Sequence, residues 1–219
     1  MALSAQNIIS RASIIIQDIT NVRWPITEMT NWFNDGRREL AVARPDIYVV
    51  TAVLTLLAGA RQKLPTGALR LMDVPRNANG AAITITQRGF LDQQNAGWHQ
   101  MPQSNSIKHF MLDERNPSNF WVYPPATSGA QVEAIFQQAP PDMVPSDILN
   151  QFEELYAGAL VDYICYRAFS KDAEYAGNPE RALAHYSQFT NSIQTGGMTT
   201  AATSPNANNI GGAATIGGR

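Results

Sequence analysis

The sequence predicts an α+β fold, with an antiparallel helical bundle built from both chain ends, a β-rich insertion and an extended C-terminal tail. Apolar residues recur at helical spacing before residue 46 and again after residue 141. Between them, short β-branched and aromatic runs alternate with turn sequences rich in Pro, Gly and Asn. We therefore expect four parts, namely residues 1–46, 47–140, 141–194 and 195–219.

Two helices are expected in the N-terminal part. Ser4 is a suitable N-cap for the first helix, and the Trp24-Pro25 step ends its pattern. Its expected buried face consists of Ile8, Ala12, Ile15, Ile16 and Ile19. The second helix is expected from Thr27 until Arg44-Pro45, because a residue before proline avoids the helical region. Its expected buried face consists of Met29, Trp32, Phe33, Gly36, Leu40 and Ala43.

The middle part has the composition of an antiparallel sheet. The expected strands lie within YVVTAVLTLL (48–57), ALRLMDV (68–74), AAITITQRG (81–89), KHFMLDE (108–114), NFWVYPPA (119–126) and QVEAIFQQA (131–139). A short helix is expected at Phe90–Trp98. The aromatic run 120–123 carries no interleaved Lys or Arg, which favours packing within a sheet over base stacking.

Helical periodicity returns after Pro140-Pro141. Ser146 is expected to cap a long helix, whose apolar face consists of Ile148, Phe152, Leu155, Tyr156, Ala159, Leu160, Tyr163 and Ile164. Asn178-Pro179 is expected to begin a last helix, whose buried face consists of Ala182, Tyr186, Phe189 and Ile193. Residues 182–218 contain no Lys, Arg, Asp or Glu, which is typical of a helix covered by neighbours.

Residues 195–219 form a tail rich in Gly, Ala, Asn and Thr. This composition buries too little apolar surface to offset the entropy of ordering, so we expect a partner to order it. The sizeable apolar side chains of the tail, Met198, Ile210 and Ile216, are the expected anchors, and Arg219 ends it. We interpret this segment as a docking tail.

No catalytic, cofactor or metal site is expected. The three histidines, His99, His109 and His185, lie in no metal-ligand spacing, and Cys165 falls in an apolar helical pattern. Adjacent residues on a helix point about 100° apart, so Glu153-Glu154 is better interpreted as a solvated face than as paired catalytic carboxylates. The sequence contains no Walker A, dinucleotide-binding, nucleophile-elbow or zincin motif. We therefore expect a protein that is not an enzyme and needs no cofactor.

The charge balance argues against a protein that grips nucleic acid. The formal net charge is −2 and the pI about 5.9, whereas phosphate binding needs a concentrated basic face. A DNA-binding or packaging accessory module remains the alternative function. The first ten residues do not have the pattern of a signal peptide, and no apolar run is long enough for a membrane span.

The order of these parts resembles the head-to-tail adaptors of short-tailed bacteriophages, also called tail tubular protein A or head-completion adaptors. The resemblance is carried by NFWVYPPA…QVEAIFQQAPPDM, then FEELYAGALVDYICYRAFSKD and NPERALAHYSQFTNSI, and it covers most of residues 1–194. It implies a structural virion protein, assembled in the host cytoplasm, in a homo-oligomeric ring typically of twelve subunits. Its implied partners are the portal protein, which the C-terminal arm reaches, the tail nozzle or tube protein, and DNA that passes without specific binding.

Residues 142–180 carry eight acidic residues against Arg167 and Lys171. A ring would multiply this charge around its central hole, where carboxylates would repel DNA phosphates and let DNA slide. Glu153, Glu154 and Asp162 are therefore candidate channel-facing residues. A solvated outer face is the alternative for these carboxylates.

Overall fold

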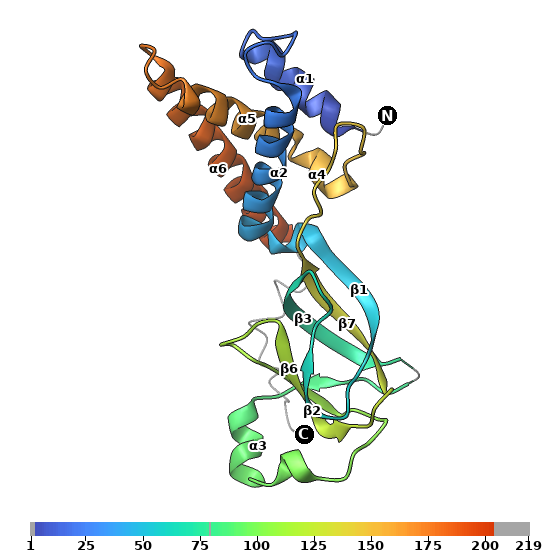
Figure 1. Ribbon diagram of the computed structural model, residues 1–219. Coiled ribbons are helices and arrows are strands. Elements are labelled where there is room, and N and C mark those ends of the chain that lie inside the picture. The colour runs from blue at the N-terminus through green and yellow to red at the C-terminus, as the bar shows by residue number, and fades with distance from the viewer. Residues whose placement is uncertain (1–2, 79, 204–219) are drawn as a thin grey trace, which may run out of the picture. The chain divides into compact units, whose positions relative to one another are not determined.

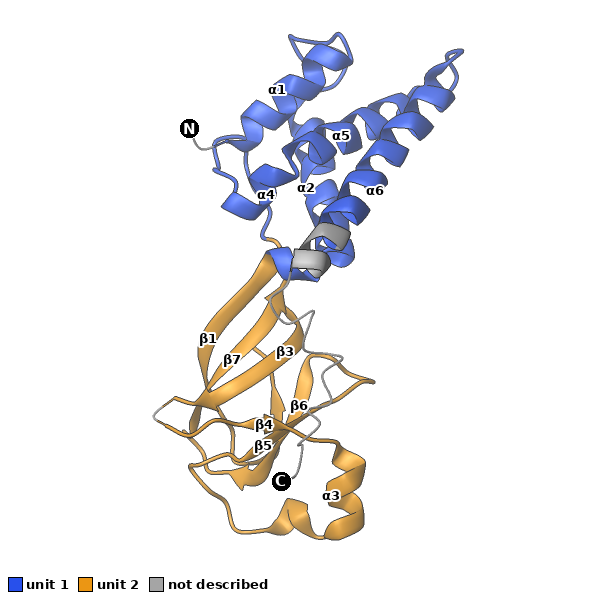
Figure 2. Cartoon of the chain, turned by 180° about the vertical axis from the view of Figure 1, so that it is seen from behind, with its two compact units in different colours: residues 1–47, 141–219 blue, residues 48–140 orange. Residues whose placement is uncertain are grey.

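The computed structural model describes residues 3–78 and 80–203, with side chains described up to residue 197. The predicted α+β class is confirmed (Figure 1). Contacts within the chain divide it into two compact units. The helical unit combines residues 1–47 with 141–219, and the β unit consists of residues 48–140 (Figure 2).

The helical unit is organised around α5, which packs against α1, α2 and α6 (Figure 1). Its helices are α1 (Ala5–Ile15), α2 (Ile26–Ala43), α4 (Gln151–Leu155), α5 (Ala157–Lys171) and α6 (Asn178–Thr203). A 3-10 turn, η1 (Pro45–Tyr48), follows α2. The larger side chains of the buried core are Ile8, Ile9, Met29, Phe33, Leu40, Leu160, Ile164 and Phe189.

The start of α1 is as predicted, and its end is not. Ser4 caps the helix, and its side chain and that of Asn7 form a reciprocal capping box. The helix stops at Ile15, and Gln17 adopts φ 60°, so the chain turns before the predicted apolar face is complete. Ile15 and Ile19 are therefore exposed, while Ile9 lies in the core.

The prediction that Ser146 caps a long helix is wrong. The backbone of residues 3–6 pairs with that of residues 145–149, including hydrogen bonds from Ala5 N to Asp147 O and from Leu149 N to Leu3 O, both 2.9 Å. Because this pairing holds the backbone extended, the helix begins only after Asn150, which caps α4. The helical run is interrupted at Tyr156, between α4 and α5.

The last helix extends further than the sequence predicted. Its expected face is largely confirmed, since Ala182, Phe189 and Ile193 are buried. However, α6 continues to Thr203, so residues 195–203 are helical and do not belong to an extended segment. Among the described residues, no helix is long and apolar enough to cross a membrane.

The β unit contains two sheets. The strands are β1 (Val49–Thr55), β2 (Gly59–Lys63), β3 (Ala68–Asn77), β4 (Thr84–Ile85), β5 (His109–Leu112), β6 (Asn119–Ala126) and β7 (Gln131–Gln138). One sheet has the order β1-β7-β3 and the other β2-β6-β5-β4. The pairs are antiparallel as expected, except that β4 runs parallel to β5. The predicted short helix is present as α3 (Arg88–Gln94), with a 3-10 turn, η2 (Trp98–Gln100), after it.

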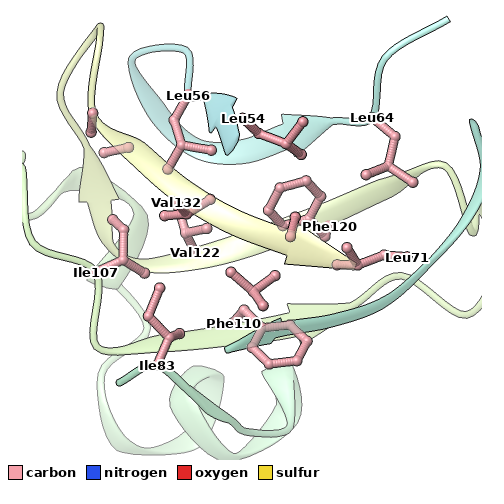
Figure 3. Packing of buried hydrophobic residues seen from close by; sticks show 14 of the residues in the cluster. Leu54, Leu56, Leu64, Leu71, Ile83, Ile107, Phe110, Phe120, Val122 and Val132 are labelled. Atoms are coloured by element: carbon pink, nitrogen blue, oxygen red, sulfur yellow. The ribbon is translucent and has the colours of Figure 1, made fainter. Parts of the chain in front are cut away.

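The core of the β unit is apolar. Figure 3 shows side chains from several strands and loops meeting there, among them Leu54, Phe110 and Phe120. Phe120 and Val122 of β6 are fully buried, so the packing interpretation of the aromatic run is confirmed. Trp121, between them, lies beneath two guanidinium groups, those of Arg61 and Arg88, at 5.6 and 5.8 Å from the ring centre.

Candidate assembly surface of the helical unit

Three large apolar side chains within α4 and just before it are exposed to solvent. Ile148, Phe152 and Leu155 are 56%, 59% and 79% exposed, and we refer to them as the α4 strip. An exposed group of this kind is typical of a protein interaction site. A helix of five residues has almost no stability of its own, so other contacts must hold α4 in place.

A buried ion pair fixes α4 from its inner side. Arg37 Nε donates to Glu153 Oε1 at 2.7 Å, and the two side chains are only 4% and 2% exposed. The second oxygen of Glu153 accepts from the backbone N–H of its N-cap, Asn150, at 3.1 Å. Arg37 also donates from Nη1 to the carbonyl of Pro141. One guanidinium from α2 therefore positions both ends of the segment that leads into α4.

Two further contacts fasten the same segment. The side-chain amide of Asn34 donates to Met143 O and accepts from Met143 N, both at 3.0 Å. Glu154 Oε1 accepts from Leu3 N at 2.8 Å, at the N-terminal end of the described chain. Buried polar groups must be hydrogen-bonded to be tolerated, and these are. The α4 strip is thus displayed on a firmly held element.

A groove of about 720 Å³ lies beside the α4 strip, between α5 and α6. Leu155 stands at its α4 end, Gly158 and Asp162 contribute from α5, and Gln188, Asn191 and Thr195 contribute from α6. Asp162 is the charged residue of this lining and contacts His185 Nδ1 at 2.8 Å. The wall formed by α6 is uncharged, so a partner could cover it without stripping water from ions.

The three predicted channel-facing residues lie in different environments in the structure. Glu153 is buried in its ion pair and cannot line a channel, so neither that prediction nor the solvated-face interpretation holds for it. Glu154 is half-buried beside Leu3, and Asp162 lies in the groove. The predicted docking residue Met198 falls within α6, and its side chain, like Ile210, Ile216 and Arg219, lies outside the described residues.

Sequence reasoning missed the α4 strip because it assigned these residues to a buried helical face. The signal was present in Asn150-x-x-Glu153, a capping-box sequence that starts the helix later than Ser146 does. A helix start at Asn150 does not by itself predict which face of α4 is exposed to solvent. That face is decided by the partner of Glu153, Arg37, which lies more than a hundred residues earlier in the chain.

A second polar contact joins Arg44 to Tyr156, a residue that lines the groove together with Thr195 and Gly196 of α6. Arg44 donates to the hydroxyl of Tyr156, and it also pairs with Asp46 through Nε–Oδ1 and Nη2–Oδ2 at 2.9 and 2.6 Å. This pairing raises the pKa of Arg44 and lowers the pKa of the Asp46 carboxyl, mainly through the side-chain hydrogen bonds between them. Gly196 of α6 lies against Tyr156 and Arg44, where a Cβ would collide with the Tyr156 hydroxyl oxygen and stand 2.9 Å from Arg44 Nη1.

The described residues contain no cluster of His, Cys, Asp or Glu that could hold a metal ion. Burial raises the pKa of the Cys165 thiol to about 12, which makes it a poor nucleophile at neutral pH.

An exposed apolar strip held by a buried ion pair, next to a groove with one uncharged wall, is typical of a structural component that assembles with other protein chains. The chain belongs to the SU10 adaptor protein family, whose model matches residues 3–210. The resemblance to phage head-to-tail adaptors is thereby confirmed, and the protein is a structural adaptor of a bacteriophage virion. No curated protein matches the chain.

Proposed function

We propose that this adaptor forms a homo-oligomeric ring, typically twelve-fold, that joins the portal ring to the tail nozzle and continues the DNA channel. The observation that carries the proposal is the α4 strip beside the groove between α5 and α6. Full burial of a Leu, Ile or Phe side chain is worth roughly 1.5–3 kcal/mol. Three such side chains on a rigid element supply a substantial part of the energy of a protein interface.

Contact with the portal is assigned to the tail. In this proposal Met198, Ile210 and Ile216 insert their apolar side chains between portal subunits, and Arg219 ends the arm. Small residues between these anchors would let the tail backbone lie close to the portal surface.

The length of α6 decides how the tail is best tested. Deleting residues 204–219 leaves α6 and the contact of Gly196 with Tyr156 in place. We expect this variant to fold normally and to lose attachment to immobilised portal rings in a pull-down. Undiminished attachment would contradict the docking role of the tail and transfer it to the helical unit.

Passage of DNA is the second part of the proposal. Glu154 remains the candidate for the channel wall, where its charge would repel phosphate over a Debye length of roughly 8 Å at physiological ionic strength. Glu154→Gln should leave assembly intact and slow DNA ejection from reconstituted virions. Unchanged ejection would contradict the channel role.

The DNA-binding alternative is tested with the same material. An electrophoretic shift with non-specific duplex DNA should show no complex at physiological salt, because binding needs a concentrated basic face. A tight complex with the steep salt dependence of phosphate binding would favour the accessory-module function instead.

A further inference from the structure

The outward face of α1 carries a cation, Arg11, for which the described part of the chain supplies no ion-pair or cation–π partner. Asn7, Ser10, Arg11 and Ile14 lie on one side of this helix, opposite its buried residues, and Ile14 is 62% exposed. Among the described residues, Arg11 makes neither an ion pair nor a cation–π contact. Every other described basic residue of the helical unit makes at least one of these, namely Arg23, Arg37, Arg38, Arg44, Arg167, Lys171 and Arg181.

The groove between α5 and α6 has the complementary composition. Its charged lining residue is an anion, Asp162, and the apolar Leu155 stands at one end. The floor and wall carry small or uncharged side chains, including Gly158, Ala159 and Ser192, which would allow the backbone of another helix to approach closely. A groove of about 720 Å³ takes the side chains of one face of a helix rather than a whole domain.

We infer that the outward face of α1 of one copy lies in the α5–α6 groove of the next copy. Arg11 then faces Asp162, and Ile14 packs against Leu155. The inference rests on the proposed ring and names the surfaces by which neighbouring subunits meet. A second copy is the occupant because the unpaired cation and the anion that matches it are carried by the same chain.

The two surfaces belong to different helices, so the contact is heterologous and each copy uses both of its surfaces. Such a contact repeats from subunit to subunit and produces a ring where the rotation closes. The contact of Asp162 with His185 leaves an oxygen of the carboxylate for a second donor, because a carboxylate has about four lone-pair sites. Arg11 supplies that donor from the neighbouring copy.

Charge reversal tests the pairing. Arg11→Glu places two acids opposite each other in every contact, and Asp162→Lys places two bases there. Each variant alone is expected to remain monomeric under conditions in which the wild-type chain assembles, with or without portal rings as template. Sedimentation velocity over a concentration series measures this, and far-ultraviolet circular dichroism establishes that each variant is folded.

The decisive experiment is an equimolar mixture of the Arg11→Glu and Asp162→Lys variants. In an alternating assembly, the acid introduced by Arg11→Glu meets the base introduced by Asp162→Lys at one contact. At the next contact the native Arg11 meets the native Asp162, so every contact is again favourable. The equimolar mixture should therefore assemble although neither component does. Glu174→Lys, which alters an exposed acid outside the groove, serves as the matched control and should assemble like the wild type.

Two substitutions in α1 keep the inference testable if Asp162→Lys fails to fold. Ile14→Asp should abolish assembly, whereas Ile15→Asp, about 100° around the same helix, should not. Assembly of the Arg11→Glu or Ile14→Asp variant as in the wild type, or a mixture of folded single variants that stays monomeric, would overturn the interface. A wild-type chain that never assembles, even on portal rings, would instead contradict the proposed ring, and the interface with it.

Discussion

The two units of this protein differ in how the chain forms them. The β unit is one continuous stretch, residues 48–140, and its larger core cluster consists entirely of apolar side chains. The helical unit must bring residues 1–47 together with residues after 141. The buried charged residues of the described chain, Arg37, Arg44 and Glu153, all lie in this second unit.

Directional contacts are needed where segments far apart in the chain must be held in one arrangement. Apolar packing tolerates small shifts between neighbouring segments, whereas a hydrogen-bonded ion pair fixes two groups in one arrangement. In the helical unit, Arg37 and Asn34 specify where residues 141–153 lie on α2. That placement also determines that the α4 strip faces outward, so the contacts that fold the unit also decide which side chains of this segment are exposed.

The largest expected loss of stability comes from truncating a large side chain in the core of the β unit. Phe120→Ala should lower its free energy of unfolding by about 3–5 kcal/mol, because Phe120 is fully buried. Trp98 and Trp121 report on this unit if Trp24 and Trp32 are replaced by Phe, so urea unfolding followed by fluorescence measures the loss. Val53→Ala, at a position 55% exposed on β1, is the control and should change little. A small loss for Phe120→Ala would contradict the apolar core described above.

A nearly equal effect is expected from breaking the buried ion pair of the helical unit. Glu153→Gln leaves Arg37 buried and uncompensated, which costs about 3–5 kcal/mol in comparable cases. Replacing both partners, as Arg37→Met with Glu153→Leu, should lose much less. Glu154→Gln, at the neighbouring half-buried carboxylate, is the control. If Glu153→Gln were no worse than Glu154→Gln, the pair would not be what positions α4.

A smaller effect is expected where two helices approach closely. A Cβ on Gly36 of α2 would stand 2.9 Å from Cδ1 and 3.0 Å from Cγ of Tyr163 on α5. Overpacking of this kind typically costs about 1–3 kcal/mol, and the buried ring of Tyr163 has little room to move. Gly36→Ala should therefore destabilise the helical unit in thermal unfolding, despite the higher helix propensity of Ala. A rise in melting temperature would show that the contact is looser.

The smallest effect distinguishes two adjacent glycines of α6. Gly197→Ala should stabilise the helix by about 0.5–1 kcal/mol, since its Cβ would meet Arg44 Cδ at an ordinary 3.5 Å. Gly196→Ala should lose this gain, because its Cβ would displace the Tyr156 hydroxyl from Arg44. Paired thermal melts of the two variants measure the difference. Equal stabilisation by both would contradict the close contact at Gly196.

Local patterns predicted the elements of both units better than their surfaces. Ser4, the stripe around Phe189 and most strands follow from spacing and turn residues in the sequence. Strand β2 was missed because GARQK has neither alternation nor β-branched residues, and pairing with β6 supplies its order instead.

The candidate surface was less predictable. Helical spacing assigned Ile148, Phe152 and Leu155 to one buried face, whereas Ile148 precedes the helix and all three side chains are exposed. The deciding contacts join residues far apart in the chain, such as Arg37 with Glu153 and Leu3 with Glu154, and no local pattern encodes such pairs. Because Arg37 is far from Glu153 in the sequence, no local pattern indicated that Glu153 is buried, and it was expected on a polar surface.

The proposed function requires that this adaptor forms a ring between portal and tail. Cryo-electron microscopy of the full-length chain incubated with portal rings tests it most directly. We expect a symmetric ring on one end of the portal, with subunits in contact through their helical units and with a hole continuous with the portal channel. Portal rings that carry no added density, or that carry separate copies without contact between neighbours, would contradict it.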